Sequence, residues 1–361
     1  MQVRQEEDRY LIDSVMKDTP AEKGGVLAGD EITAVDGTPV KGVTMEKLVS
    51  LLRGEKGSKV KVTLSRTGSQ PLTVELTRAP IPVTTVTHAM LENGVGEIVI
   101  SRFAESTAKE FNKSFEELQK KGMKKLVLDL RSNPGGLLVP TIDIANKLIP
   151  KGKMILEVDY KDDKKVQKYY SKQKTALNLP IVVLVNGQTA SAAEVLSAAL
   201  KESAGAKVIG TTTFGKGIVQ SFGQYKDNSV LKLTEAQWKT PNGEWIHKKG
   251  VKPDESVDLP AYASLPALPS GEELKKGDYG DHVKTLQSML EALGYGPADQ
   301  PGVFGEKTDA DIRSFQTRSK IDATGVVTDR TAYMLMDQLR TKLQQEDPQK
   351  KAALKAISGA G

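Results

Sequence analysis

The middle of the chain, from about Pro82 to Pro260, alternates short apolar runs with longer amphipathic stretches. The apolar runs cover residues 95–100, 126–130, 181–185 and 207–210. Between them, the apolar positions recur at helical spacing. These helical stretches cover residues 106–121, 141–148 and 190–200. Apolar strands that alternate with helices predict βαβ units, in which helices cover a sheet.

The segment up to about Arg78 follows a different pattern, in which apolar and polar residues alternate at period two. This alternation is typical of strands in a half-buried sheet. The predicted strands include residues 30–35, 60–64 and 72–76, and the predicted helix covers residues 44–52. This segment is therefore predicted to be a separate domain of strands and a helix.

The last third of the chain begins with a stretch rich in Pro, Ala and Ser, which is typical of a linker. A helical segment follows, and it contains an internal echo: Leu286-Gln287 and Phe315-Gln316 each follow an apolar residue and two polar ones. The tail after Gln344 is charged and Ala-rich, and we expect it to be frayed.

These patterns divide the chain into five parts. They are an N-terminal domain at residues 1–80, a core at 81–260, a linker at 261–273, a helical domain at 274–340 and a tail at 341–361.

Composition narrows the class of protein. Hydrophobic residues make up 38% of the 361 residues and charged residues 27%, which is a globular balance. The net charge of +5 is spread along the chain, which argues against nucleic acid and is compatible with an anionic envelope surface. The absence of cysteine excludes a thiol nucleophile, a thiolate metal site and disulfides.

Targeting signals are missing from the sequence. No apolar run approaches the ~20 residues that a membrane span needs, and no signal peptide opens the chain. The polar start MQVRQEEDRYLID leads us to expect an upstream segment that carries the signal or anchor, and an N-terminal domain that is truncated.

Two stretches of the core place reactive groups where strands end. Asp129 to Gly136 follows an apolar run and ends in Pro-Gly-Gly, a loop that exposes backbone N–H groups to a ligand. Ser191 stands where a strand gives way to an Ala-rich helix, so the helix dipole would favour its alkoxide. Taken alone, the first stretch is a common turn and Ser191 is a common helix cap.

A third stretch surrounds Lys216, which lies between two glycines. Residues 210–216 fit the phosphate-loop pattern G-x-x-x-x-G-K, but Gly217 supplies no hydroxyl for Mg²⁺ where that motif requires one. A nucleotide site is therefore disfavoured, and a solvated loop lysine is the ordinary alternative.

Together the three stretches resemble the carboxyl-terminal processing, or tail-specific, serine peptidases. That family carries a serine in a Ser-Ala-Ser-Ala-Ser-Glu-type run, then a Phe-Gly-Lys-Gly run followed by glutamine. Lys216 follows Ser191 by 25 residues here, as in the family. The resemblance implies that Ser191 is the nucleophile, Lys216 the general base and Gln220 the residue that orients the lysine. Thr189 and Ala193 depart from the family's flanking serines.

The resemblance also implies an oxyanion hole. One N–H would come from Gly135 or Gly136, between which the sequence does not decide, and the second from Ala192. A lysine removes a proton only when it is neutral, and burial among Phe214, Ile218 and Val219 would disfavour its ammonium form. The histidines His88, His247 and His282 are interpreted as ordinary residues, although a Ser-His-Asp triad assembled in space remains an alternative.

The N-terminal segment resembles a PDZ domain. The matching residues are Thr19-Pro20-Ala21-Glu22, Gly29-Asp30-Glu31-Ile32 and Val35-Asp36-Gly37. Such domains capture a C-terminal peptide by adding it to a sheet edge. Arg53, at the end of the predicted helix, is a candidate for coupling this domain to the core, with a solvated helix end as the alternative.

The third segment resembles peptidoglycan-binding domains of the three-helix type. The matching residues include Gly277, Gly280, Leu286-Gln287, Leu293-Gly294-Tyr295, Phe304-Gly305, Phe315-Gln316 and Gly325. Most of these are core or turn residues, so they specify the fold more than the ligand.

The resemblance thus implies a multidomain protein of the α/β and α+β classes. Its parts would be a PDZ sandwich or partial barrel, an α/β core of the crotonase-like ββα type and a small three-helix domain. We expect a serine endopeptidase that cleaves proteins near their C-termini, without metal or cofactor. The expected location is extracytoplasmic, in the cell envelope or anchored through a segment absent from this chain.

The expected partners are proteins with apolar C-terminal tails, peptidoglycan and a second copy of the chain, but not nucleic acid. Two other functions compete with the peptidase. One is a non-catalytic peptide- and wall-binding adaptor with a relic core, and the other is an NTPase at residues 210–216.

Overall fold

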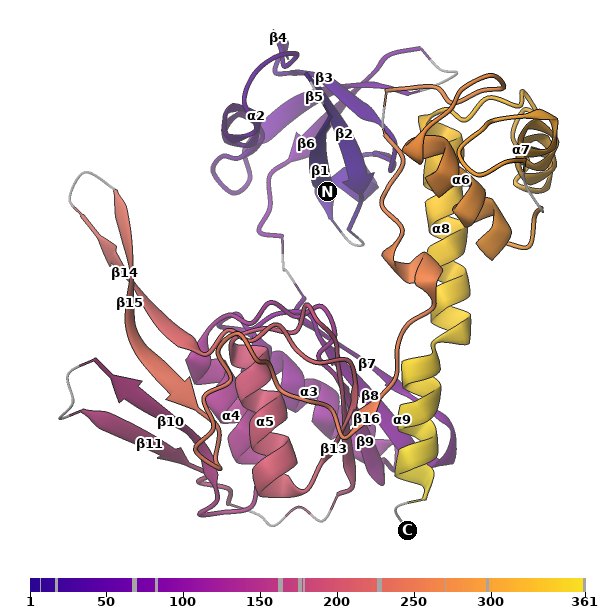
Figure 1. The fold of residues 1–361 in the computed structure, drawn as a ribbon. Helices are drawn as coiled ribbons and strands as arrows, with labels where there is room; N and C mark the ends of the chain where they lie inside the picture. The colour runs from indigo at the N-terminus through magenta and orange to yellow at the C-terminus, as the bar shows by residue number, and fades with distance from the viewer. Residues whose placement is uncertain are drawn as a thin grey trace. The chain divides into compact units, whose positions relative to one another are not determined.

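The computed structural model describes residues 1–6, 8–16, 19–66, 70–81, 84–161, 165–174, 177, 179–225, 229–269, 271–296 and 299–359. The chain forms two compact units (Figure 1). One contains residues 1–83 and 260–345, and the other contains residues 84–259 and 346–361. Among the helices described, none is long and apolar enough to cross a membrane.

The N-terminal domain is built around a sheet with the order β1-β2-β3-β5-β6, and β4 pairs with β3. Its strands are β1 (Gln2–Glu6), β2 (Arg9–Ser14), β3 (Glu31–Val35), β4 (Thr38–Pro39), β5 (Lys59–Ser65) and β6 (Leu72–Thr77). Its helices are α1 (Pro20–Lys23) and α2 (Met45–Leu52). The period-two strands are confirmed, because Val60, Val62 and Leu64 of β5 are buried while Lys59 and Lys61 are exposed. The polar start of the chain is itself a strand, β1, in an antiparallel hairpin with β2.

The third domain consists of helices α6 (Asp281–Ala292), α7 (Glu306–Arg318) and α8 (Asp329–Glu346). The internal echo in the sequence has a structural cause in two buried glutamines. The Gln287 side chain accepts from Gly302 N and donates to Val303 O, at 2.8 and 2.9 Å. Gln316 repeats both bonds with Gly325 N and Val326 O, at 3.0 and 2.8 Å. Each glutamine thus fixes the loop before the next helix.

The expected linker is partly folded against this third domain. It contains a 3-10 helix, η2 (Ala261–Ser264). Leu268 is buried in the hydrophobic core of the domain, and Tyr262 and Leu265 pack against that core.

The second unit has a six-stranded sheet in the order β16-β13-β12-β9-β8-β7. The strands are β7 (Val86–Met90), β8 (Val95–Ile100), β9 (Lys125–Asp129), β12 (Ile181–Val185), β13 (Lys207–Gly210) and β16 (Glu255–Ser256), and a 3-10 helix η1 (Glu92–Gly94) joins the first two. All neighbouring pairs are parallel except β7 with β8. The carboxyl ends of β9 and β12 therefore lie side by side, which brings the loops after Asp129 and Val185 together.

Helices cover both faces of this sheet (Figure 1). The helices α3 (Thr107–Lys120), α4 (Leu138–Leu148) and α5 (Ala192–Ala204) pack on one face. The other face carries Val127, Val182 and Leu184 and is covered by α9 (Pro348–Ser358). The expectation that the tail after Gln344 is frayed is therefore wrong for residues 345–346, which complete α8, and for α9.

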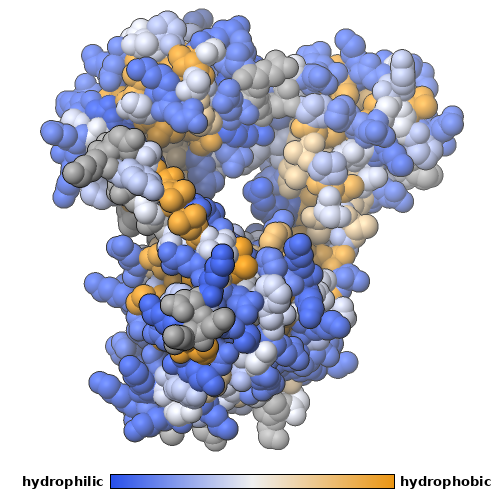
Figure 2. All heavy atoms as spheres, turned by 60° about the vertical axis from the view of Figure 1, so that its left-hand side comes forward, coloured by the Kyte–Doolittle hydropathy of each residue, from blue (hydrophilic) through white to orange (hydrophobic). Residues whose placement is uncertain are grey.

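A second, antiparallel sheet has the order β11-β10-β15-β14 and was not predicted. Its strands are β10 (Met154–Tyr160), β11 (Val166–Tyr170), β14 (Ile218–Gln224) and β15 (Val230–Lys239). The face of the molecule drawn in Figure 2 is mostly hydrophilic, with hydrophobic residues in small groups. The exposed apolar side chains of this sheet and its connections include Val166, Tyr170, Tyr225, Val230, Leu231 and Leu233.

Candidate active site

Ser191 lies in the turn between strand β12 and helix α5. Its backbone has φ 55° and ψ −118°, a conformation that residues other than glycine rarely adopt. Such strain persists only where the surroundings enforce it, and it concentrates at functional sites. In α/β-hydrolases, for example, the nucleophilic serine lies on a strained strand-to-helix turn.

Glu194, one turn into α5, joins the serine segment to the lysine segment. Its fully buried carboxylate accepts from the N–H groups of Ser191, Gly215 and Lys216 at 2.8, 2.7 and 2.8 Å. It also accepts from Thr213 Oγ1 at 2.5 Å. Sequence reasoning missed this role, although an acidic residue three positions after a serine at a helix start is a recognised capping pattern.

The loop that carries Lys216 is fixed on its other side by two tryptophans. The indole Nε1 of Trp238 donates to Lys216 O at 3.0 Å, and that of Trp245 donates to Gly217 O at 2.9 Å. A side chain at Gly217 would meet His247 N at 2.8 Å, so only glycine fits. The backbone at Lys216 and Gly217 is thus held by both tryptophans.

The loop between β9 and α4 lies against Ser191. A Cβ at Gly135 would stand 2.8 Å from the Cβ of Ser191, and Gly135 and Gly136 have φ of 96° and 142°. Gly135 N donates to Asn133 Oδ1 at 2.8 Å. Within the described chain, no hydrogen-bond partner is found for the N–H groups of Gly136 and Ala192. Those two N–H groups are therefore candidates to donate to a ligand.

A cleft of about 780 Å³ brings the expected site residues together. Its lining includes Ser191, Lys216, Gln220, Gly135, Gly136 and Ala192. No hydrogen bond between described residues joins Lys216 Nζ to Ser191 Oγ. Gln220 Nε2 instead points to Thr234 Oγ1 of β15, at 3.5 Å.

The surroundings of the lysine differ from those expected. Phe214 is 64% exposed, so it does not bury Lys216, and Ile218 and Val219 are only half-buried. Lys232 of β15 also lines the cleft, and sequence reasoning did not identify it.

The three histidines have other surroundings. His88 contacts Ser114 Oγ at 3.0 Å and Glu117 at 3.2 Å, which ties β7 to α3. His247 stacks on Trp245 with ring centroids 5.3 Å apart. His282 is exposed on α6, in the other unit.

Arg53 ends α2 and lines a separate pocket of about 580 Å³ in the N-terminal domain. Apolar side chains of β1 and α2 form much of that pocket, among them Val3, Met45, Val49 and Leu52. Over the residues that the structure describes, no cluster of His, Asp or Glu suited to a metal is found.

Comparison with known proteins identifies three domain families along the chain. Residues 94–257 match Peptidase family S41, residues 11–66 a PDZ domain and residues 279–335 a putative peptidoglycan binding domain. The chain is 44% identical over 357 residues to the carboxy-terminal processing protease CtpA of Bacillus subtilis (strain 168), covering 99% of this chain and 76% of the relative. It is 37% identical over 347 residues to a probable CtpA-like serine protease of Staphylococcus aureus (strain N315), covering 96% and 70%.

Among solved structures, the photosystem II D1 C-terminal processing protease is similar over 72% of each chain, with 34% identity and a TM-score of 0.44. The expected family, the multidomain fold class and the serine-type enzyme class are confirmed. This chain belongs to the S41 peptidases and is a serine-type carboxyl-terminal processing protease.

Proposed function

We propose that the chain cleaves proteins near their C-termini through a dyad of Ser191 and Lys216. The observation that carries this proposal is the cleft in which a strained serine, a lysine and two unpaired backbone donors meet. Neutral Lys216 would take the proton of Ser191 Oγ as that oxygen attacks the scissile carbonyl. The N–H groups of Ala192 and Gly136 would bind the resulting oxyanion.

The rest of the cycle follows from the same groups. The lysine ammonium would give its proton to the leaving amine, and water would then hydrolyse the acyl-enzyme. Gln220 would have to turn from Thr234 to orient the lysine. The described arrangement is therefore a resting one, and Lys216 Nζ would come within hydrogen-bond reach of Ser191 Oγ in the reacting form.

The test compares Ser191→Ala and Lys216→Ala on an unfolded protein with an apolar tail. We expect both variants to lose activity by a factor of about 10³ or more. Lys249→Ala is the matched control, because its exposed side chain lies on a neighbouring loop, and Lys232→Ala tests the second lysine of the cleft. Full activity in either dyad variant contradicts the proposal, and a serine that no fluorophosphonate labels favours the adaptor alternative.

We further propose that the PDZ-type domain delivers apolar substrate tails. Its pocket supports this, since apolar side chains line it: Met45, Val49 and Leu52 of α2, with Met1 and Val3. Val49→Asp should weaken cleavage of a tailed substrate and leave a substrate without the tail unaffected. The coupling role of Arg53 stays a prediction, tested by Arg53→Ala in the same assay.

Location and assembly are proposals of the same kind. The third domain supports binding to peptidoglycan, and hence an extracytoplasmic place in the cell envelope. Co-sedimentation of residues 1–361 with purified peptidoglycan tests the binding. Analytical ultracentrifugation tests the homodimer.

A further inference from the structure

The last helix of the chain is part of the peptidase unit. Ala353 and Ile357 of α9 are fully buried against one face of the central sheet. At the C-terminal end of the helix, Lys125 Nζ donates to Ile357 O at 2.9 Å. Along its side, Lys350 pairs with Glu97 of β8 at 2.7 Å. The helix is therefore docked by apolar and polar contacts along its length.

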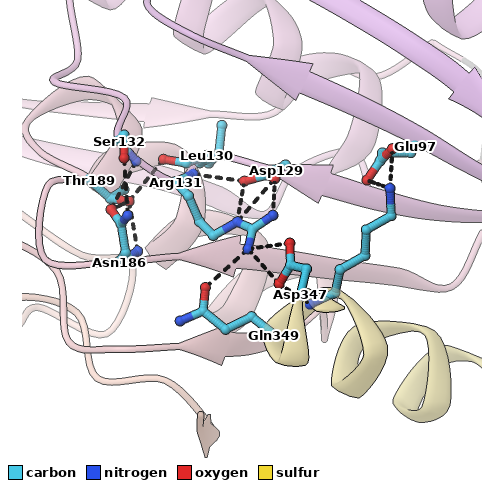
Figure 3. Close-up of polar contacts among 10 residues, drawn as sticks. Glu97, Asp129, Leu130, Arg131, Ser132, Asn186, Thr189, Asp347 and Gln349 are labelled. Carbon is cyan, nitrogen blue, oxygen red and sulfur yellow. Dashed lines mark hydrogen bonds and ion pairs between the residues drawn. The ribbon is translucent and has the colours of Figure 1, made fainter. Parts of the chain in front are cut away.

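The N-terminal end of α9 holds one arginine of the core (Figure 3). Arg131 Nη1 lies 2.8 Å from Asp347 Oδ2 and donates to Gln349 Oε1 at 3.1 Å. Gln349 is fully buried, and its Nε2 donates to Val257 O at 2.8 Å. Asp347 also caps the helix by accepting from Lys350 N at 2.9 Å.

Arg131 stands at the start of the loop that leads to the active site. Its guanidinium pairs with Asp129 at 2.7 Å, so two carboxylates share one arginine. Burial alone would lower the pKa of Arg131, but the hydrogen bonds and charges of Asp129 and Asp347 outweigh it and raise the pKa above its usual range. The guanidinium thus stays charged and is fixed by partners on two elements.

Three further hydrogen bonds connect the loop after Arg131 to the segment of Ser191 and fix its shape. Ser132 N donates to Asn186 Oδ1 at 2.8 Å, in the turn before the serine. Buried Asn133 then accepts Ala190 N at its carbonyl, at 2.9 Å, and Gly135 N at its side chain. The loop from Arg131 to Gly136 is thus anchored at one end by α9 and pressed at the other against the nucleophile.

We propose that Asp347 and Gln349 are positioning residues of the peptidase, which hold Arg131 and thereby set the loop 132–136 against Ser191. This inference rests on the proposed function, because the loop matters for rate only if it supplies an oxyanion donor. A donor misplaced by a fraction of an ångström stabilises the transition state less, while substrate binding is little changed.

The test compares Asp347→Asn with Lys350→Gln in the full-length protein. Asparagine keeps the helix cap but removes the negative charge that faces the Arg131 guanidinium. Lys350→Gln is the matched control, because it breaks the other ion pair of the same helix, away from Arg131. We expect Asp347→Asn to lower kcat by about tenfold with KM unchanged, and Lys350→Gln to leave both constants near their original values. Gln349→Ala should act in the same direction as Asp347→Asn.

A structural role alone would give a different pattern. Both variants would then lower the melting temperature while kcat of the folded protein stayed the same, and that result overturns the proposal. An equal fall of kcat in both variants overturns the assignment to Asp347, because it would make the whole helix responsible.

A second measurement does not depend on activity. In a Ser191→Ala background, amide hydrogen exchange of Ser132, Asn133 and Gly135, whose N–H groups are hydrogen-bonded, should accelerate with Asp347→Asn and not with Lys350→Gln. If the protein proves inactive, the proposed function fails while this exchange still tests the anchoring. If activity depends on Ser191 and exchange is unchanged, the positioning inference alone fails.

Discussion

At the scale of single residues, the Glu194 carboxylate connects the backbone of the two residues of the proposed dyad. It binds the backbone N–H of Ser191 and of Lys216, so it fixes both residues without touching their reactive atoms. Glu194→Gln replaces one acceptor oxygen by an NH₂ group that faces N–H donors. We expect a loss of about 1–3 kcal/mol in the free energy of unfolding, because buried donors lose their partner.

The same substitution should lower kcat by about 10²-fold, since nucleophile and base would both shift. Chemical denaturation and steady-state kinetics measure the two effects. Glu202→Gln on the same helix is the control, because its carboxylate accepts from Asn242 N and does not line the cleft. An active Glu194→Gln enzyme would show that the carboxylate does not position the dyad.

The grouping of site residues was predictable where short motifs carry them. Ser191, Lys216 and the glycine loop line one cleft, as expected from three stretches far apart in the sequence. The direction of a side chain was not predictable, as Phe214 shows by facing solvent. Nor was the choice between Gly135 and Gly136, because it depends on which N–H the Asn133 side chain takes.

At the scale of elements, Glu110 joins helix α3 to strand β7. Its carboxylate accepts from Thr85 N at 2.7 Å and Val86 N at 3.1 Å. Partial burial would raise the pKa of Glu110, but hydrogen bonds from Ser106, Thr85 and Val86 outweigh it and hold the pKa below its usual range. A lowered pKa in the folded state means that the ionised carboxylate stabilises the fold.

That stabilisation is present above the unfolded pKa of about 4.3 and is lost as pH falls through the lower folded value. We therefore expect the free energy of unfolding to decline on acidification below about pH 5, and to decline less in Glu110→Gln. Denaturation at a series of pH values measures this. Glu116→Gln, exposed on the same helix, should keep the original pH slope.

Whether an element could be predicted depended on how it is buried. The strands β9 and β12 are buried on both faces, and β5 on one face, so their burial shows as a pattern in the sequence. Most of β15 is exposed, so its residues carry no burial pattern. Helix α9 packs on the sheet mainly through small alanine side chains and Ile357. Its sequence is charged and Ala-rich and has few large apolar residues, so no burial pattern was visible in it.

At the scale of the whole molecule, the chain leaves the peptidase unit at Leu259 and returns to it at Glu346. Arg131 and Asp347 are 216 positions apart in the sequence, yet they form an ion pair. Patterns within a window of a few residues do not encode such a contact, which is why the sequence suggested a core that ends at Pro260. The peptidase unit is instead discontinuous, with the third domain inserted before its last helix.

Because the peptidase unit is discontinuous, we expect a chain that ends at residue 345 to aggregate. Without α9, the apolar face formed by Val127, Val182, Leu184 and Ile209 would meet water, and exposed patches of this kind promote aggregation. We expect poor solubility from that truncation, while removal of residues 359–361 should have no effect. The milder variant Ile357→Ala should stay folded and cost about 2–5 kcal/mol, because it leaves a cavity under the helix. Soluble yield and denaturation curves measure both effects, and a stable, active chain ending at 345 would show that the helix is dispensable to the unit it completes.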